Sequence, residues 1–261
     1  MDFFQFDPNQ LLSFFLTMFR VSIVLFLLPF FGGQSVPNMV KGAIVLVLTL
    51  AIWPQLSFPG TLMPNNGWEI ATMFLGEIIL GLVLALLVNF LFAAVQTGGQ
   101  IIGFQMGFAM INVVDPVTGV SEAITAHFLY MVVMLVFLVL NGPLYLMTAL
   151  GKSFELVPPG GLLLTPELTH EVLAFSEQIF LLAIKIAAPV MAALFMVDLS
   201  LALITKAAPQ MNVLLVGFPV KIAVGFLFLF GIFEILATFV SGYLQRFAPI
   251  YENVLHSGSP F

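Results

Sequence analysis

The stretch that decides the fold is residues 70–95, which read IATMFLGEIILGLVLALLVNFLFAAV. This run is almost wholly apolar and long enough to cross a bilayer, since a spanning helix needs about 20 apolar residues. Its one charged residue, Glu77, lies inside the run. A charge at the centre of a bilayer costs at least about 2.5–3.5 kcal/mol, so we expect Glu77 to be paired or to face protein or water.

The composition of the whole chain points the same way. Of its 261 residues, 61% are apolar and 8% are charged, whereas a soluble domain is about 45–50% apolar and about 25% charged. This excludes a soluble enzyme and a disordered chain. The net charge of −6 gives no basic surface for nucleic acid, and the absence of cysteine excludes disulfides and thiolate metal sites. The chain is therefore a membrane protein or part of a membrane-associated assembly.

Further apolar stretches lie before and after the 70–95 stretch, at residues 11–31, 42–53, 123–150, 172–207 and 211–244. The 42–53 stretch is too short to span a bilayer, and the 172–207 stretch is too long for one straight span. The 123–150 stretch is interrupted by an Asn-Gly-Pro sequence at 141–143. These lengths predict an all-α, multi-pass membrane-type fold of helical hairpins with broken helices.

The strongest break in the chain is VPPGG at residues 157–161. We expect a single domain over 1–261, with N-terminal hairpins in 1–157 and C-terminal hairpins in 162–256. Thr165 followed by Pro166 predicts a helix start there, because Thr caps helices and Pro fits their first turn.

Several charges lie inside apolar stretches, where we expect them to be buried: Arg20, Glu77, Lys185, Asp198, Lys221 and Glu234. Two explanations stay open, a transporter with a polar interior and helices that pack against other subunits. Arg20 has no acid in its own stretch and needs a partner from elsewhere. Lys185 and Asp198 flank Pro189 and pair with each other only if the helix bends back.

Residues 96–119 read QTGGQIIGFQMGFAMINVVDPVTG. Gly99, Gly103 and Gly107 are four apart, and on a helix they form a smooth stripe that lets another backbone come close. Ordinary helix packing is the plain interpretation of this stripe.

The same segment carries a cluster of bulky apolar side chains, Met106, Phe108, Met110 and Ile111. The residues that end any helix after them are Asn112, Asp115, Pro116 and Gly119. Adaptable Met and Phe side chains at a loop can close a hole around changing contents, and apolar constrictions gate pores. This segment is therefore the candidate gate.

Residues 206–221, KAAPQMNVLLVGFPVK, combine Pro209 and Pro219 with the amides of Gln210 and Asn212. Broken helices at membrane depth are tolerated only where they are buried in protein or line a cavity. The segment should then face a partner or a channel. A tight turn between two helices is the alternative.

The sequence offers no catalytic or metal-binding pattern, since its three histidines, at 127, 170 and 256, are far apart and match no ligand motif. We therefore predict no catalytic residue, no metal and no cofactor. Two alternatives stay open. One is a self-contained secondary transporter that uses Glu77, Lys185, Asp198 and Glu234. The other is an intramembrane enzyme at Glu122 or His127.

Residues 208–213 (APQMNV), running into 217–221 (GFPVK), resemble the signature of the FliR family of export-gate subunits in flagellar and virulence type III secretion. Arg20, the Gly76-Glu77 pair and the Gly-rich 98–119 region agree with the family in order. The resemblance covers nearly the whole chain.

The resemblance implies a non-enzymatic core subunit of a flagellar export gate, at the flagellar basal body in the bacterial inner membrane. Its partners would be FliP-like and FliQ-like subunits in a helical hetero-oligomer, a FlhB-like subunit, exported unfolded flagellar proteins and membrane lipid, with no nucleic acid. The family's plug would map onto residues 105–119, including Met106, Phe108, Met110, Ile111, Asp115 and Pro116. Subunit packing would involve Gly99, Gly103, Gly107, Pro209, Gln210, Asn212, Gly217, Pro219 and Lys221.

Overall fold

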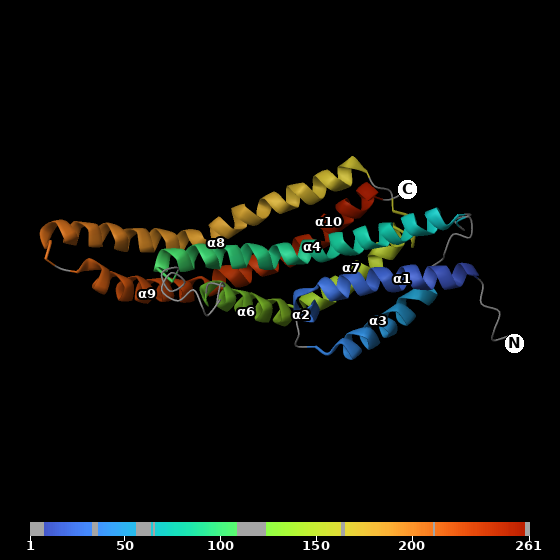
Figure 1. Ribbon diagram of the computed structural model, residues 1–261, viewed down its shortest axis with the longest axis horizontal. Coiled ribbons are helices and arrows are strands. Elements are labelled where there is room, and N and C mark those ends of the chain that lie inside the picture. The colour runs from blue at the N-terminus through green and yellow to red at the C-terminus, as the bar shows by residue number, and fades with distance from the viewer. Residues whose placement is uncertain are drawn as a thin grey trace. The chain divides into compact units, whose positions relative to one another are not determined.

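The computed structural model describes residues 8–32, 36–55, 64, 66–108, 124–162, 165–210 and 212–258. All regular structure within these ranges is helical (Figure 1). The elements are α1 (Pro8–Leu27), α2 (Pro29–Gly32), α3 (Asn38–Ile52), the 3-10 helix η1 (Trp53–Gln55), α4 (Gly67–Met106), α6 (Ile124–Val139), α7 (Gly142–Leu156), α8 (Pro166–Ala207), α9 (Val213–Gly231) and α10 (Phe233–Gly258). The all-α prediction is confirmed.

Two compact units make up the chain, and they are interleaved along the sequence. Unit 1 contains Met1–Asn89, Asn141–Phe175 and Leu244–Phe261, and unit 2 contains Phe90–Leu140 and Ser176–Tyr243. We expected the break at 157–161 to separate two sequential parts. Residues 157–161 lie inside unit 1, and α4, α8 and α10 each contribute residues to both units.

Among the described residues, three helices have the length and apolar composition to cross a membrane, namely α1, α4 and α8. The bent pairs α6–α7 and α9–α10 bring the number to five if each pair is one span. α3, with 15 residues, is too short, as the sequence predicts. α4 and α8 have 40 and 42 residues, which makes each about 60 Å long, against a hydrocarbon core about 30 Å thick. Ordinary tilts of up to about 40° cannot absorb that difference, so part of each helix must lie outside the hydrocarbon.

The predicted break at 141–143 is confirmed. α6 and α7 meet at a bend of 67°. Asn141 adopts the left-handed conformation, with φ 57°, which a short polar side chain tolerates better than most. Pro143 then lies in the first turn of α7, where its missing N–H costs no helical hydrogen bond.

Prolines at two other positions lie inside helices and do not end them. Pro189 lies inside the continuous helix α8, and Pro219 lies inside α9. An interior proline costs about 3 kcal/mol. In α8 the burial of neighbouring side chains offsets this cost, since Ala187, Val190 and Leu194 are each 0% exposed. The bend of 44° in the last apolar stretch falls instead at the junction of α9 and α10.

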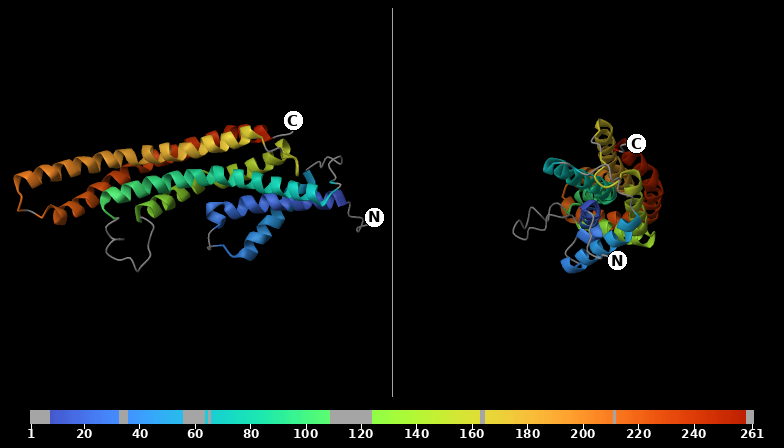
Figure 2. Two further views of the ribbon diagram at one scale, coloured as in Figure 1. Left: turned by 45° about the horizontal axis from the view of Figure 1, so that its top comes forward. Right: turned by 90° about the vertical axis from the view of Figure 1, so that its right-hand side faces the viewer.

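Each unit has its own apolar core. In unit 1, α1 packs along α3, and Phe14 meets Trp53 edge to face with ring centroids 5.6 Å apart. In unit 2, Phe92 of α4 contacts Tyr130 and Phe137 of α6, both with centroids 5.5 Å apart. Figure 2 shows α9 folding back along the C-terminal half of α8.

Candidate functional site

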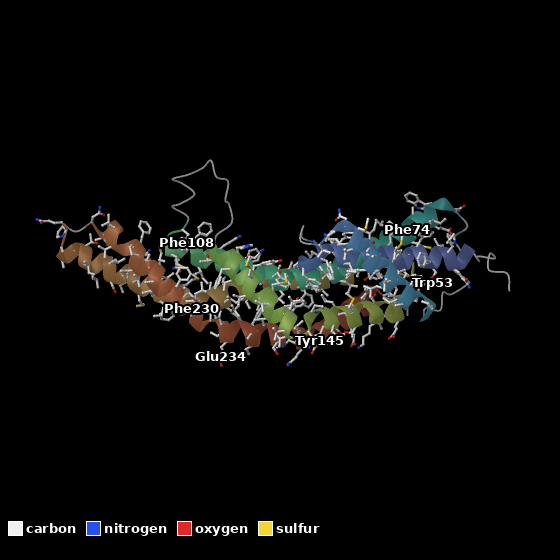
Figure 3. All side chains as sticks on the ribbon, turned by 90° about the horizontal axis from the view of Figure 1, so that it is seen from below. Trp53, Phe74, Phe108, Tyr145, Phe230 and Glu234 are labelled. Atoms are coloured by element: carbon white, nitrogen blue, oxygen red, sulfur yellow. The ribbon has the colours of Figure 1, made fainter. Side chains whose placement is uncertain are left out.

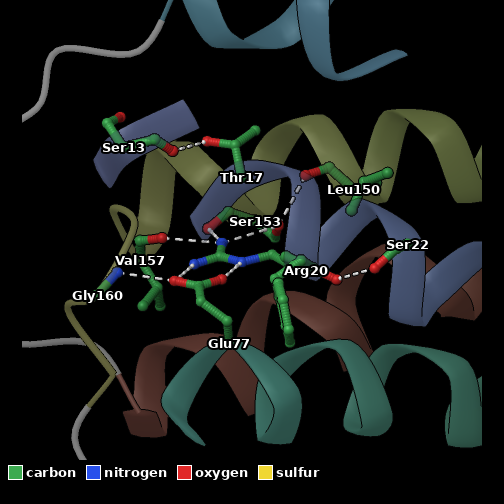
Figure 4. A network of polar contacts seen from close by, with 10 residues as sticks. Ser13, Thr17, Arg20, Ser22, Glu77, Leu150, Ser153, Val157 and Gly160 are labelled. Carbon is green, nitrogen blue, oxygen red and sulfur yellow. Dashed lines mark hydrogen bonds and ion pairs between the residues drawn. The ribbon is translucent and has the colours of Figure 1, made fainter. Parts of the chain in front are cut away.

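A buried ion pair lies in unit 1. Arg20 of α1 donates from Nε to Glu77 Oε2 at 2.5 Å and from Nη2 to Glu77 Oε1 at 3.0 Å (Figure 4). The two side chains are 0% and 1% exposed. Glu77 of α4 is therefore the partner that Arg20 lacks within its own stretch. The paired geometry is the strong form of a guanidinium–carboxylate interaction.

The remaining atoms of this pair are also engaged. Arg20 Nη1 donates to the carbonyl oxygens of Ser153 and Val157, both at 3.0 Å, and to the Ser153 hydroxyl at 3.2 Å. The N–H of Gly160 donates to Glu77 Oε1 at 2.7 Å. The network thus fastens α7 and the following turn to α1 and α4. The roles of Ser153, Val157 and Gly160 were not predicted, because these residues act mainly through backbone donors and acceptors, which leave no signal in the sequence.

The start of the candidate gate is defined by the end of α4. Gly107 has φ +93°, its N–H donates to Phe104 O at 3.1 Å, and the N–H of Phe108 donates to Gly103 O at 3.1 Å. This pair of bonds is a Schellman motif, in which glycine supplies the left-handed residue just past the helix. Gly107 therefore ends α4 and does not continue the glycine stripe that we expected on a helix. A glycine after the last periodic residue is the sequence signal for this role.

Two residues at this end of α4 fit closely against α9. Met106 is 0% exposed. It occupies the space beside Gly225, where a Cβ would lie 2.7 Å from Met106 Cε. The ring of Phe218 fills the space beside Gly107, where a Cβ would lie 2.6 Å from Phe218 Cε1.

A third contact completes this arrangement. Phe108 and Phe226 meet edge to face with centroids 6.5 Å apart, and Figure 3 shows the place of Phe108. We call the three α9 residues that receive this end of α4 the α9 seat: Phe218, Gly225 and Phe226. Two segments that the sequence analysis singled out separately, the candidate gate and the signature, are therefore in contact. The other candidate gate residues, Met110, Ile111, Asp115 and Pro116, lie outside the described residues.

Gly99 packs within the chain. A Cβ at this position would lie 2.6 Å from Ala126 Cα, and Thr125 Oγ1 donates to Gly99 O at 2.7 Å. Gly103 is also buried. The close backbone approach that the stripe predicts is thus made by Gly99 of α4 with α6 of the same chain.

The signature segment forms the connection between α8 and α9 and the start of α9. α8 ends at Ala207 and α9 begins at Val213, which matches the tight-turn alternative. Pro209, Gln210, Asn212 and Pro219 are exposed, whereas Gly217 is buried against Leu201. A cleft of about 410 Å³ opens between the two helices, lined by Asp198, Leu201, Thr205, Asn212, Val213, Gly217, Phe218 and Lys221.

Lys221 forms an ion pair with Asp198 at this cleft. The Asp198 side chain is 43% exposed and that of Lys221 is 21% exposed. Lys185 precedes Asp198 by about 20 Å along one unbroken helix, so the two do not pair. Lys185 and Glu234 are both exposed, and Glu234 points away from α10 (Figure 3). Of the charges expected to be buried, the chain by itself buries Arg20 and Glu77 and leaves the others at least partly exposed.

The half-exposed pair gives a prediction of modest size. Reversing one charge, in Asp198→Lys, should destabilise the chain by up to about 1 kcal/mol, because exposed ion pairs contribute little. The double exchange, Asp198→Lys with Lys221→Asp, should restore most of that loss. Denaturant unfolding of the purified protein in detergent measures both. A double exchange less stable than the single one would contradict a direct pair.

The described ranges contain no candidate metal centre. Within them, no three His, Asp or Glu side chains gather closely enough to hold a metal ion. His127 is exposed and stacks on Tyr130, with centroids 6.4 Å apart. Glu122 lies outside the described residues.

The described helices define the class of protein: an all-helical chain of the membrane type, with bilayer-length apolar helices and one buried ion-pair network in unit 1. Its family follows from sequence comparison. The sequence model of "Bacterial export proteins, family 1" matches residues 11–247, so the chain belongs to that family.

Named relatives extend the match over most of the chain. The flagellar biosynthetic protein FliR of Escherichia coli K12 is 30% identical over 87% of this chain and 86% of its own. FliR of Bacillus subtilis 168 is 29% identical over 93% of this chain and 94% of its own. The surface presentation of antigens protein SpaR of Salmonella typhimurium LT2 is 29% identical over 77% of this chain and 75% of its own.

Proposed function

We propose that this chain is a non-enzymatic core subunit of the flagellar type III protein export gate, and that it forms part of the pore for unfolded substrates. The observation that carries the proposal is the match over residues 11–247 to a bacterial export family, with relatives named for flagellar biosynthesis. FliP-like, FliQ-like and FlhB-like subunits are the proposed partners. The proposed location is the flagellar basal body in the bacterial inner membrane.

The apolar surface of α8 supports an assembly rather than a lone chain. Its large exposed apolar side chains extend from Leu173 to Ile204, which is about 46 Å along the helix. The hydrocarbon core covers only about 30 Å. The excess needs a cover other than lipid, since large exposed apolar patches mark interaction sites. Helices of neighbouring subunits would provide that cover.

We assign residues 105–119 as the plug of the pore. Near the start of this segment, Met106, Gly107 and Phe108 contact the α9 seat, and Met106 is fully buried there. A segment that starts from a fixed point, and continues with Met110 and Ile111, can present soft apolar side chains at a constriction. The transporter alternative has less support, because Glu77 is held by Arg20 and Gly160, and Asp198 is paired with Lys221.

The plug assignment predicts a leak. Replacing residues 106–111 by Gly and Ser in cells that carry the complete apparatus should raise ion conductance across the membrane, because the apolar closure is lost. Ion leak and export of flagellar proteins are measured together. Phe104→Ser is the matched control, since Phe104 is 64% exposed on α4, two residues before the replaced segment. Unchanged leak in the 106–111 variant would reject the plug.

A further inference from the structure

We propose that Phe218 is a positioning residue that holds the end of α4, and with it the start of the plug, in its resting place. This inference rests on the proposed function. Phe218 belongs to α9, far in sequence from the plug, and acts through the residue that it contacts, Gly107.

The contact is close and specific. The positions of Phe218 Cε1 and Cδ1 are 2.6 and 2.7 Å from where a Cβ on Gly107 would stand. The ring therefore occupies the space that a side chain at position 107 would need. Gly107 is also the residue whose φ of +93° turns the chain out of α4. If this turn moves, it must either push the Phe218 ring aside or lose its contact with that ring.

Phe218 also borders free space. The ring is one of the walls of the 410 Å³ cleft between α8 and α9. Close-packed side chains can move only where free volume exists. The cleft provides that volume next to the ring, so displacement of Phe218 into the cleft is the movement that would release Gly107.

Contacts with α8 hold α9 just before and just after Phe218. Lys221, one turn after Phe218, is paired with Asp198 of α8. Gly217, just before it, would place a Cβ 3.1 Å from Leu201 Cδ1, so α8 and α9 are in close contact there. Phe218 thus contacts the end of α4 and also lines a cleft, on a helix that is held to α8 at both neighbouring positions.

The test compares four variants in cells that carry the complete export apparatus. The readouts are ion leak, flagellar protein export and the amount of this subunit in the purified assembly. Phe218→Ala should raise leak about tenfold at normal abundance, since the partly buried ring would lose about 1.4 kcal/mol of apolar contact, which changes an equilibrium by that factor. Phe218→Leu, which keeps apolar bulk, should rescue part of the effect. Thr205→Leu, which fills the cleft, should lower export without leak. Leu227→Ala, 68% exposed on the same helix, is the control.

Gly107→Ala tests the steric contact from the other side. Its added Cβ meets the ring, and a φ of +93° is also strained for alanine, so this variant should cause leak. The double variant with Phe218→Ala removes only the clash, and it should leak no more than the worse single variant. If Phe218→Ala shows no increase in ion leak while the 106–111 replacement does, Phe218 does not position the plug and the proposed function stands. If neither leaks, the plug itself is rejected. If the Phe218→Ala subunit is missing from the assembly, the Phe218→Leu variant is the test. Increased ion leak in Phe218→Leu at normal abundance supports the positioning role of Phe218. Ion leak at the wild-type level in Phe218→Leu overturns that role.

Discussion

Replacing Arg20 by alanine should lower the free energy of unfolding by about 3–5 kcal/mol, because it leaves a carboxylate buried without its countercharge. Glu77 is 1% exposed and has Arg20 as its paired cation. The carbonyl oxygens of Ser153 and Val157 lose their guanidinium donor at the same time. A loss of this size is a large part of the about 5–15 kcal/mol that holds a typical domain together. Denaturant unfolding in detergent, together with the level of the protein in membranes, measures it.

Three further variants separate the possible causes. Arg20→Lys keeps the charge but not the planar fork, so it should recover only part of the stability. Arg20→Met combined with Glu77→Leu removes both charges and keeps apolar volume, and it should be more stable than Arg20→Ala alone. Lys152→Ala breaks the exposed Lys152–Glu252 pair, and its effect on stability should be small beside that of Arg20→Ala. Wild-type stability of Arg20→Ala would show that the pair contributes no net stability.

The sequence could predict that Arg20 needs a partner, but it could not identify the partner. A cation in an apolar helix must be neutralised, and this rule is local. Which acid neutralises it depends on how α1 packs against α4, and Glu77 is 57 positions away. The supporting atoms are backbone groups at Ser153, Val157 and Gly160, which any residue type could supply.

The helices themselves were predictable from apolar runs, whereas their interruptions were only partly so. The break at Asn141 combines a left-handed residue with a following Pro, and both effects are local. Pro189 has the same local cost, but buried neighbours in α8 offset it, and that packing is not visible in the sequence. Gly107 and Gly99 belong to one spacing pattern. Gly107 ends α4, whereas Gly99 lets α6 come close to α4. The role of each glycine depends on the part of the chain that surrounds it.

The second large effect is expected at Gly99. Gly99→Val should destabilise the chain by about 3 kcal/mol, at the upper end of what overpacking costs. A Cβ at this position would stand 2.6 Å from Ala126 Cα, 3.0 Å from Ala126 N and 3.1 Å from Thr125 O. These are backbone atoms, so α4 and α6 would have to separate, and the Thr125 hydrogen bond to Gly99 O would be lost with them. Unfolding of the purified chain in detergent measures the effect.

The controls distinguish packing inside the chain from packing between subunits. Gly151→Ala, in α7, meets no heavy atom within 4 Å and should be neutral or stabilising by up to about 1 kcal/mol. Ala126→Gly should not rescue Gly99→Val, because the conflict is with the backbone of residue 126 and not with its methyl group. If Gly99 serves subunit packing alone, Gly99→Val would leave the isolated chain stable and fail only in the assembly. Because the close approach is made within the chain, the loss should already appear when no partner is present.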